Sequence, residues 1–272
     1  MSIQTTNKIT LYSEIIDKAR DLGASLAGIV NIHDLKSSPS HLISGKMVEF
    51  GGVGTKKVEG KKSGQVEFPD NAHSAVVIAV KHPFELPELD WWVKGLKGGT
   101  QGNLKLISIL SELAQWLEKE RNIKSIKPAY HIEHGAVYMK DAAVLAGLGC
   151  IGKNNMLITP EFGPRVRLRV MLIDIEIPST GQINYDPCDD CKEYCKKACP
   201  QNAFDKQIYF SEEFAQNELP SRTGVYNRIQ CNIQMQNDIL NGKDVNVESK
   251  SIVGKEVRYC RLCEFACPAG KV

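Results

Sequence analysis

Two cysteine runs near the C-terminus constrain this chain more than any other feature. The first run reads C-x2-C-x3-C-x3-C-P over residues 188–200, and the second reads C-x2-C-x3-C-P over residues 260–268. Cys231 lies between the runs, so eight of the nine cysteines fall within the last 85 residues. Thiols grouped in short runs that end at a proline are typical of metal or metal–sulfur ligation.

The rest of the chain favours a compartment in which these thiols stay reduced. The N-terminal segment lacks both the basic-then-apolar pattern of a secretion signal and a twin arginine. No apolar run approaches the roughly 20 residues that span a bilayer, and a net charge of +2 gives no overall attraction to nucleic acid or membrane. We therefore expect a cytoplasmic protein, in which disulfides are rare.

The spacing fits two [4Fe–4S] clusters. In two-cluster ferredoxins a short run supplies three thiolates to one cubane, and the cysteine that precedes the proline ligates the other cluster. One cluster would be held by Cys188, Cys191, Cys195 and Cys267. The other would be held by Cys199, Cys231, Cys260 and Cys263. A pair of zinc sites is the alternative, because C-x2-C also occurs in zinc ribbons, but a regular ribbon spacing is absent.

The apolar periodicity before residue 180 predicts a mixed α/β (α+β) domain. Helices are expected over residues 8–22, 103–120 and 138–147. Strands are expected over residues 26–30, 75–80, 155–159 and 165–175, the second of which is apolar enough to be covered on both faces. After Pro178 the composition changes to cysteine, lysine and short irregular stretches. We therefore place a domain boundary there, between residues 1–180 and 181–272.

Residues 133–164 read EHGAVYMKDAAVLAGLGCIGKNNMLITPEFGP and contain A-G-L-G-x-I-G-K-N followed by a T-P-E-F-G turn. This stretch resembles the core of epoxyqueuosine reductases and of their relatives, the reductive dehalogenases. The match is densest over residues 133–170 and continues through the cysteine runs. The resemblance implies a nitroreductase-like, corrinoid-binding domain over residues 1–180. A ferredoxin-like domain of the bacterial type, with two [4Fe–4S] clusters, would follow over residues 181–272.

The resemblance also implies cobalamin bound without its lower axial base, with a flavin as the less favoured cofactor. The cofactor-binding candidates are Gly147, Gly149, Cys150, Ile151, Gly152, Lys153 and Asn154. Glycines would let the backbone approach a flat macrocycle closely. The alternative is a helix C-cap at Gly147 or Gly149 followed by a tight turn into a strand. For Cys150 a buried, inert thiol is the favoured reading.

Reductive cleavage of a C–O or C–halogen bond requires a proton donor. Counting back fourteen residues from Gly147 reaches Glu133, the position at which the epoxyqueuosine enzymes carry an aspartate. Glu133 is therefore the candidate catalytic acid. Asp141 and Tyr138 are weaker candidates, since Asp141 is expected in the first turn of a helix and Tyr138 in the core. His131 and His134 are expected to be structural.

Two classes of function remain open. The first is an enzyme, in which electrons pass from two clusters to a base-off corrinoid that reductively cleaves a small organic or nucleoside substrate. The second is an electron-transfer or corrinoid-handling protein without its own substrate. Either would need a low-potential donor of the ferredoxin or flavodoxin type, and neither involves a membrane.

Transfer RNA is a doubtful partner on the sequence alone. Many epoxyqueuosine enzymes carry an additional C-terminal helical-repeat region that helps to hold transfer RNA, whereas this chain ends five residues after its last cysteine. Their substrate segment is not recognisable either, because residues 91–103 read WWVKGLKGGTQGN. Trp91, Trp92 and Lys94 are candidates for a pocket over the cofactor, with surface packing as the alternative.

Overall fold

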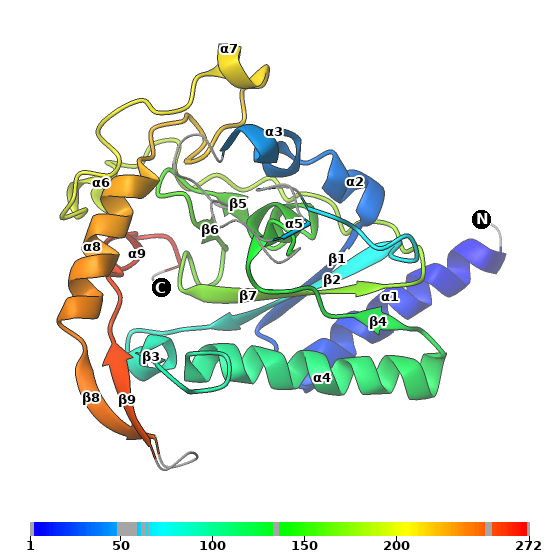
Figure 1. Cartoon of the computed structure of the whole chain (residues 1–272). Coiled ribbons are helices and arrows are strands. Elements are labelled where there is room, and N and C mark those ends of the chain that lie inside the picture. Colours follow the sequence, from blue (N-terminus) through cyan, green and yellow to red (C-terminus); the bar gives the residue numbers. More distant parts are fainter. Residues whose placement is uncertain are drawn as a thin grey trace.

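The computed structural model describes residues 3–47, 59–60, 64, 66–132, 136–247 and 252–270. Its centre is an antiparallel four-stranded sheet with the strand order β1-β2-β7-β4 (Figure 1). These strands are β1 (Leu26–Asn31), β2 (Ser74–Lys81), β7 (Val166–Ile173) and β4 (Ser125–Ile126). Helices pack on both faces of the sheet, which confirms the predicted mixed α/β class.

Strand β2 is buried on both faces, as its continuous apolar run predicts. Its even-numbered residues from Val76 to Val80 lie in one core with α1 (Ile3–Asp21) and α4 (Gln101–Arg121). Its odd-numbered residues from Ala75 to Ala79 lie in a second core with α2 (Ile32–Lys36) and α5 (Met139–Leu145). Successive side chains of a strand point to opposite faces, so β2 joins the two cores.

The three predicted helices form close to their expected bounds. Helix α4 begins after Thr100, whose hydroxyl accepts a hydrogen bond from the Asn103 amide, and ends at Asn122 in a left-handed conformation. Helix α5 ends before Gly147, which has a φ of 73°. The short helix α3 (Pro39–Met47), which the periodicity does not predict, follows α2.

The strand expected over residues 155–159 is shorter than predicted. It reduces to β6 (Leu157–Ile158), which pairs with β5 (Cys150–Ile151) in a small hairpin. Asn155 has a positive φ of 58° and belongs to the turn of this hairpin, while Thr159 bridges to Gly163. Both ends of the predicted strand therefore lie in turns and not in extended backbone.

The cysteine-rich part contains short helices and one hairpin. The helices are α6 (Tyr194–Lys197), α7 (Ser211–Phe214), α8 (Arg228–Leu240) and α9 (Leu262–Phe265). The hairpin of β8 (Lys243–Val247) and β9 (Ile252–Val257) pairs through β9 with β3 (Trp92–Val93). Strand β3 lies between the 3-10 helix η2 (Pro87–Asp90) and α4, so this sheet joins the cysteine-rich part to the first part. None of the described helices is both long and apolar enough to cross a membrane.

A buried charge network also fastens the two parts together. Arg167 of β7 contacts Asp90 through Nε at 2.8 Å and Glu264 through Nη2 at 3.0 Å. Arg261 contacts the same two carboxylates, with Nε 3.0 Å from Glu264 Oε2 and Nη1 2.5 Å from Asp90 Oδ2. His82, which is fully buried, lies with Nδ1 2.9 Å from Asp90 Oδ1. We call these five residues the arginine–carboxylate network.

The network determines where two thiols of the second cysteine run lie. Arg261 directly follows Cys260, and Glu264 directly follows Cys263, so fixing these two charged side chains also fixes the C-x2-C turn. Burial by itself would raise the pKa of Asp90, but the hydrogen bond with His82 and the nearby arginines outweigh it and lower that pKa. The carboxylate therefore remains ionised and paired.

Replacing Arg167 by methionine should destabilise the protein. The change leaves Asp90 and Glu264 with one cation instead of two, and a broken buried ion pair costs about 3–5 kcal/mol. We discount this to about 2–4 kcal/mol because the Arg167 side chain is 29% exposed. The melting temperature of the purified protein should fall by roughly 4–16 °C. Arg20→Met, at an exposed position of α1, is the control and should melt like the wild type. Equal melting temperatures for both variants would contradict the role of the network.

Candidate functional site

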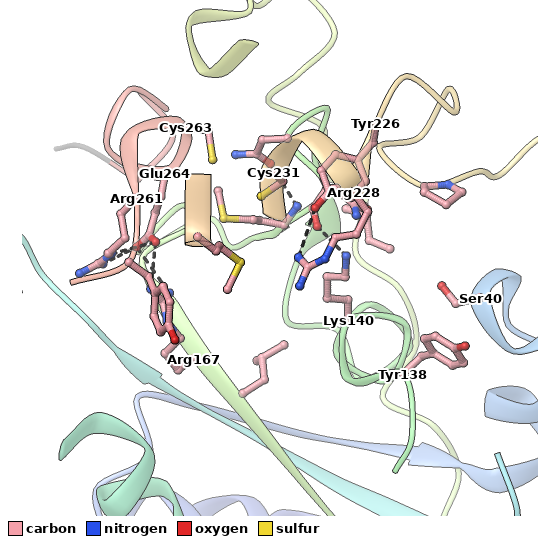
Figure 2. A pocket seen from close by; sticks show the side chains of 18 of the residues that line it. Ser40, Tyr138, Lys140, Arg167, Tyr226, Arg228, Cys231, Arg261, Cys263 and Glu264 are labelled. Atoms are coloured by element: carbon pink, nitrogen blue, oxygen red, sulfur yellow. Dashed lines mark hydrogen bonds and ion pairs between the residues drawn. The ribbon is translucent and has the colours of Figure 1, made fainter. Parts of the chain in front are cut away.

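A cavity of about 1550 Å³ lies between the α/β part and the cysteine-rich part. Its lining residues come from α5 and the β5–β6 hairpin, and from α8 and the second cysteine run. Arg167, Arg261 and Glu264 of the arginine–carboxylate network lie on one side of this cavity, and Lys140 and Arg228 lie on the other (Figure 2).

One set of four thiols lines this cavity: Cys199, Cys231, Cys260 and Cys263. Three of them pack against Ala203, Phe204 and Tyr226. The backbone amide of the remaining one, Cys260, donates to Asp238 Oδ2 at 2.7 Å. Because these thiols come from both runs and from α8, only the folded chain brings them together.

The other set surrounds a separate small cavity of about 20 Å³ and consists of Cys188, Cys191, Cys195 and Cys267. The structure therefore groups the thiols into the same two sets of four that the spacing predicts. Among the described residues, no three His, Cys, Asp or Glu side chains lie close enough to hold a single metal ion.

Burial raises the pKa of four of these thiols, namely Cys195, Cys260, Cys263 and Cys267. It raises the pKa of Cys195 to about 11, with a further contribution from Cys267. It raises the pKa of Cys263 to about 12, with a further contribution from Cys260. Thiolates are the ligating form, so loading either set releases protons.

The predicted cofactor loop contacts the large cavity with only some of its residues. Cys150, Ile151 and Asn154 line the large cavity, and Lys153 and Asn154 line the small one. Lys153 also pairs with Glu193, with Nζ 2.9 Å from Oε1. The loop therefore separates the two thiol sets and contacts both cavities.

The three loop glycines pack closely against other parts of the protein, and their contact with a macrocycle stays a prediction. A Cβ on Gly149 would lie 2.1 Å from the carbonyl oxygen of Ile158, and one on Gly152 would lie 2.3 Å from the Ile158 side chain. Gly147 is the left-handed residue that follows α5. The space beside these glycines is filled by protein, so the C-cap alternative describes Gly147 and close strand pairing describes Gly149.

Cys150 lies between the two cavities. It lines the large cavity and packs with Ile158, Cys188 and Cys267 beside the small one. Burial raises the pKa of Cys150 to about 11, and Cys188 adds to the shift. Thiolates are the reactive form, so this shift disfavours reactivity. Cys150 is partly buried, and its inertness stays a prediction.

The predicted proton donors differ in where the structure places them. Glu133 lies outside the described residues, and so does His134. Asp141 is in the first turn of α5, as predicted, and accepts hydrogen bonds of 2.7 Å from both the amide and the hydroxyl of Ser40. Tyr138 is buried and donates to the Gly64 carbonyl at 3.3 Å, although it also lines the large cavity, as His131 does.

The tryptophan segment contributes one of its three predicted pocket residues. Trp92 lines the large cavity, whereas Trp91 and Lys94 do not. The guanidinium of Arg258 lies 3.6 Å from the centre of the Trp91 ring, which assigns Trp91 to packing outside the cavity.

Sequence reasoning missed two cations of the large cavity. Lys140 of α5 donates through Nζ to the Asn155 carbonyl at 2.6 Å. Burial lowers the pKa of Lys140 to about 8, and Arg228 lowers it further while Asp141 opposes the change. Arg228, the first residue of α8, donates to the Tyr226 hydroxyl at 3.4 Å. Two signals were present in the sequence: a charged residue at position 140 of a largely apolar helix, and the place of Arg228 just before Cys231 in the stretch that resembles the related reductases.

Comparison with known proteins identifies relatives of the whole arrangement. No protein-family model matches the chain. The chain is 24% identical to the epoxyqueuosine reductase of Bacillus cereus over 270 residues, which are 96% of this chain and 65% of that protein. It is 29% identical to the tetrachloroethene reductive dehalogenase of Sulfurospirillum multivorans over 132 residues, which are 47% of this chain and 23% of that protein. The resemblance to these reductases is confirmed. The chain spans just under two thirds of the Bacillus cereus protein.

The fold of epoxyqueuosine reductases matches as well. The enzyme from Streptococcus thermophilus superposes with a TM-score of 0.64 at 22% identity, over 97% of this chain and 67% of that one. A second solved epoxyqueuosine reductase, in complex with an epoxyqueuosine-modified tRNA stem loop, gives a TM-score of 0.61 at 22% identity over 97% of this chain and 66% of that one. The expectation that transfer RNA is a doubtful partner is therefore not borne out.

Gly149→Ala should damage the hairpin, because the added Cβ meets backbone that cannot rotate away. We expect a loss of about 1–3 kcal/mol of stability, the usual cost of overpacking. A lower melting temperature and weaker visible absorbance from the set around Cys267 would report it, since Ile158 packs on that thiol. Gly45→Ala is the matched control, because nothing lies within 4 Å of its new methyl group. Wild-type behaviour of Gly149→Ala would show that the hairpin tolerates a side chain there.

Proposed function

We propose that this protein is a cobalamin-dependent iron–sulfur reductase of the epoxyqueuosine reductase type. Electrons would enter from a low-potential donor of the ferredoxin or flavodoxin type and pass through two [4Fe–4S] clusters. A bound base-off corrinoid would supply the reductive cleavage of a C–O or C–halogen bond. The substrate would be a small organic molecule or a nucleoside, including a nucleoside within transfer RNA, since a solved relative is in complex with a tRNA stem loop.

The observation that carries this proposal is a large cavity shared by both parts of the chain. Its volume of about 1550 Å³ exceeds the roughly 300–1,000 Å³ of an ordinary small-molecule pocket. This is enough room for a macrocycle together with a substrate. Four thiols line the same cavity, so a cluster held there would lie next to the bound cofactor without intervening protein layers.

The lining residues are of the kind that a corrinoid requires. Trp92, Tyr130 and Leu168 offer flat or apolar surface, while Asn154 and Asn155 offer amides to the amide groups at the rim of a corrin. Burial leaves the Asn154 side-chain nitrogen without a hydrogen-bond partner among the described residues. A buried donor without a partner costs free energy of folding unless a ligand accepts a hydrogen bond from it. Asn154 is therefore a candidate contact for the cofactor.

The chemistry requires protons from the chain. Cleavage of a carbon–halogen bond consumes two electrons and one proton and releases a halide ion, whereas removal of an epoxide oxygen consumes two electrons and two protons and releases water. Glu133 is the proposed donor. The sequence places it between His131 and Tyr138, both of which line the cavity. Apolar surroundings would favour its neutral, proton-donating form.

Cys267→Ala tests the crossed ligation of the two clusters. The reconstituted wild type should contain roughly eight iron and eight sulfide per chain, as two cubanes require. The variant should lose the same electron paramagnetic resonance signal as Cys191→Ala and keep the signal that Cys263→Ala loses. Cys150→Ala removes the one cysteine outside both sets and should keep both signals. A Cys267→Ala spectrum that matches Cys263→Ala would contradict the assignment.

The Glu133→Gln variant distinguishes a reductase from an electron-transfer or corrinoid-handling protein without its own substrate. The amide keeps the size of the side chain but removes its transferable proton, so turnover should fall by about 10²–10⁴-fold. Cobalamin binding and cobalt reduction, followed by visible spectroscopy, should stay at wild-type levels. The substrates are a tRNA stem loop that contains epoxyqueuosine and the free epoxyqueuosine nucleoside. Glu161→Gln, at an exposed carboxylate outside the cavity, is the matched control. Undiminished turnover in Glu133→Gln would remove Glu133 from the mechanism, and a wild type that reduces cobalt but converts neither substrate would favour the carrier.

A further inference from the structure

Lys140 and Arg228 place two positive charges together on one wall of the large cavity. They come from α5 and α8, which belong to different parts of the chain, and their side chains point toward one another (Figure 2). Both residues line the cavity. Two like charges so close together destabilise each other unless an anion lies nearby.

Among the described residues, no carboxylate of the cavity wall forms an ion pair with Lys140 or Arg228. Asp90 and Glu264 are each held by both arginines of the arginine–carboxylate network. Asp141 is next to Lys140 in sequence, but both of its oxygens accept hydrogen bonds from Ser40. Glu218 is exposed and forms no ion pair with either cation in the part of the chain that the structure describes.

The hydrogen bonds of the two cations leave most of their donors available. Lys140 has three N–H donors and uses one on the Asn155 carbonyl. Arg228 has five, and the bond found for it among the described side chains goes to the Tyr226 hydroxyl. Neither partner carries a charge. Burial is the main cause of the lowered pKa of Lys140; Asp141 opposes the shift, and the nearby Arg228 adds to it.

We propose that Lys140 and Arg228 form a subsite for a phosphodiester group inside the cofactor cavity. A phosphodiester carries one negative charge and two free oxygens, so one oxygen can accept from the guanidinium while the other accepts from the ammonium. Lys140 and Arg228 lie on the opposite side of the cavity from the arginine–carboxylate network (Figure 2). A phosphodiester bound between them would therefore stay away from Arg167 and Arg261.

The same chemistry can come from two sources. The nucleotide tail of cobalamin contains one phosphodiester, and in the base-off form this tail extends away from cobalt and needs a place to bind. A nucleic-acid substrate also carries phosphodiesters on either side of the reacting nucleoside. The subsite rests on the proposed function for its location but not for its chemistry, because the charge pair exists without either ligand.

The experiment compares three probes on the cluster-loaded protein: hydroxocobalamin, cobinamide, which lacks the nucleotide tail, and an unmodified RNA stem loop. Visible titration measures the first two and fluorescence anisotropy the third. Lys140→Gln and Arg228→Gln remove one charge each, and Lys140→Arg restores it. The exposed Lys119→Gln on α4 is the matched control and should bind all three probes like the wild type.

Each lost charged hydrogen bond should weaken the relevant probe by about 10- to 100-fold. If the wild type prefers hydroxocobalamin over cobinamide and the glutamine variants lose that preference, the phosphodiester belongs to the cofactor tail. If RNA binding falls instead, it belongs to the substrate. Lys140→Arg should recover most of the loss in either case. If neither the corrinoid preference nor RNA binding depends on the charge pair, the proposal is wrong.

The same titrations distinguish two further outcomes from the proposed subsite. Arg228 lies one helical turn before Cys231, so its role could instead be to balance the charge of a cluster. In that case Arg228→Gln would change the cluster spectrum, while Lys140→Gln would leave all three affinities at wild-type values, which overturns the subsite. A wild type that binds neither corrinoid would contradict the proposed function, and the RNA titration would still decide the anion subsite.

Discussion

The contact between Arg167 and the carboxylates of Asp90 and Glu264 is the constraint on which the rest of the site depends. Arg167 belongs to a central strand of the main sheet, and Glu264 belongs to α9, directly after Cys263. Buried charges at such a junction are costly unless each is paired with good geometry. The second cysteine run is therefore held in one position against the sheet, and that position defines one wall of the large cavity.

The two thiol sets differ in their relation to that cavity. One set lines it directly, and the other surrounds a small cavity behind the β5–β6 hairpin. The hairpin lies between them, and its glycines allow β5 and β6 to approach closely enough to leave both spaces open. An electron path from the small cavity to the large one would run past Cys150, which contacts both.

The chemistry of the cavity wall is divided between its two sides. On one side, the arginines are fully matched by carboxylates, which makes that side a structural junction. On the other side, Lys140 and Arg228 form no ion pair with a carboxylate among the described residues, and this is the side that we propose for an anionic ligand. Paired charges stabilise a fold, whereas unpaired charges beside a cavity indicate binding.

The sequence by itself determined the features that depend on local spacing. Periodicity placed α1, α4 and α5 and the buried strand β2, because an apolar face must repeat at the period of its element. Cysteine spacing predicted the grouping of the thiols into two sets, and the loop motif indicated the related reductases. These signals lie within short windows, so no long-range contact was needed to read them.

Only the tertiary structure decided which distant residues meet around the cavity. Asp90, Arg167 and Glu264 are separated by about 175 residues of chain from first to last, and nothing in their local sequence indicates that they meet. Lys140 and Arg228 converge for the same reason. The role of Gly149 also required the fold, because its close neighbour, Ile158, lies on the partner strand of the hairpin. Ion pairs and packing contacts of this kind depend on distances between elements, which a single sequence does not contain.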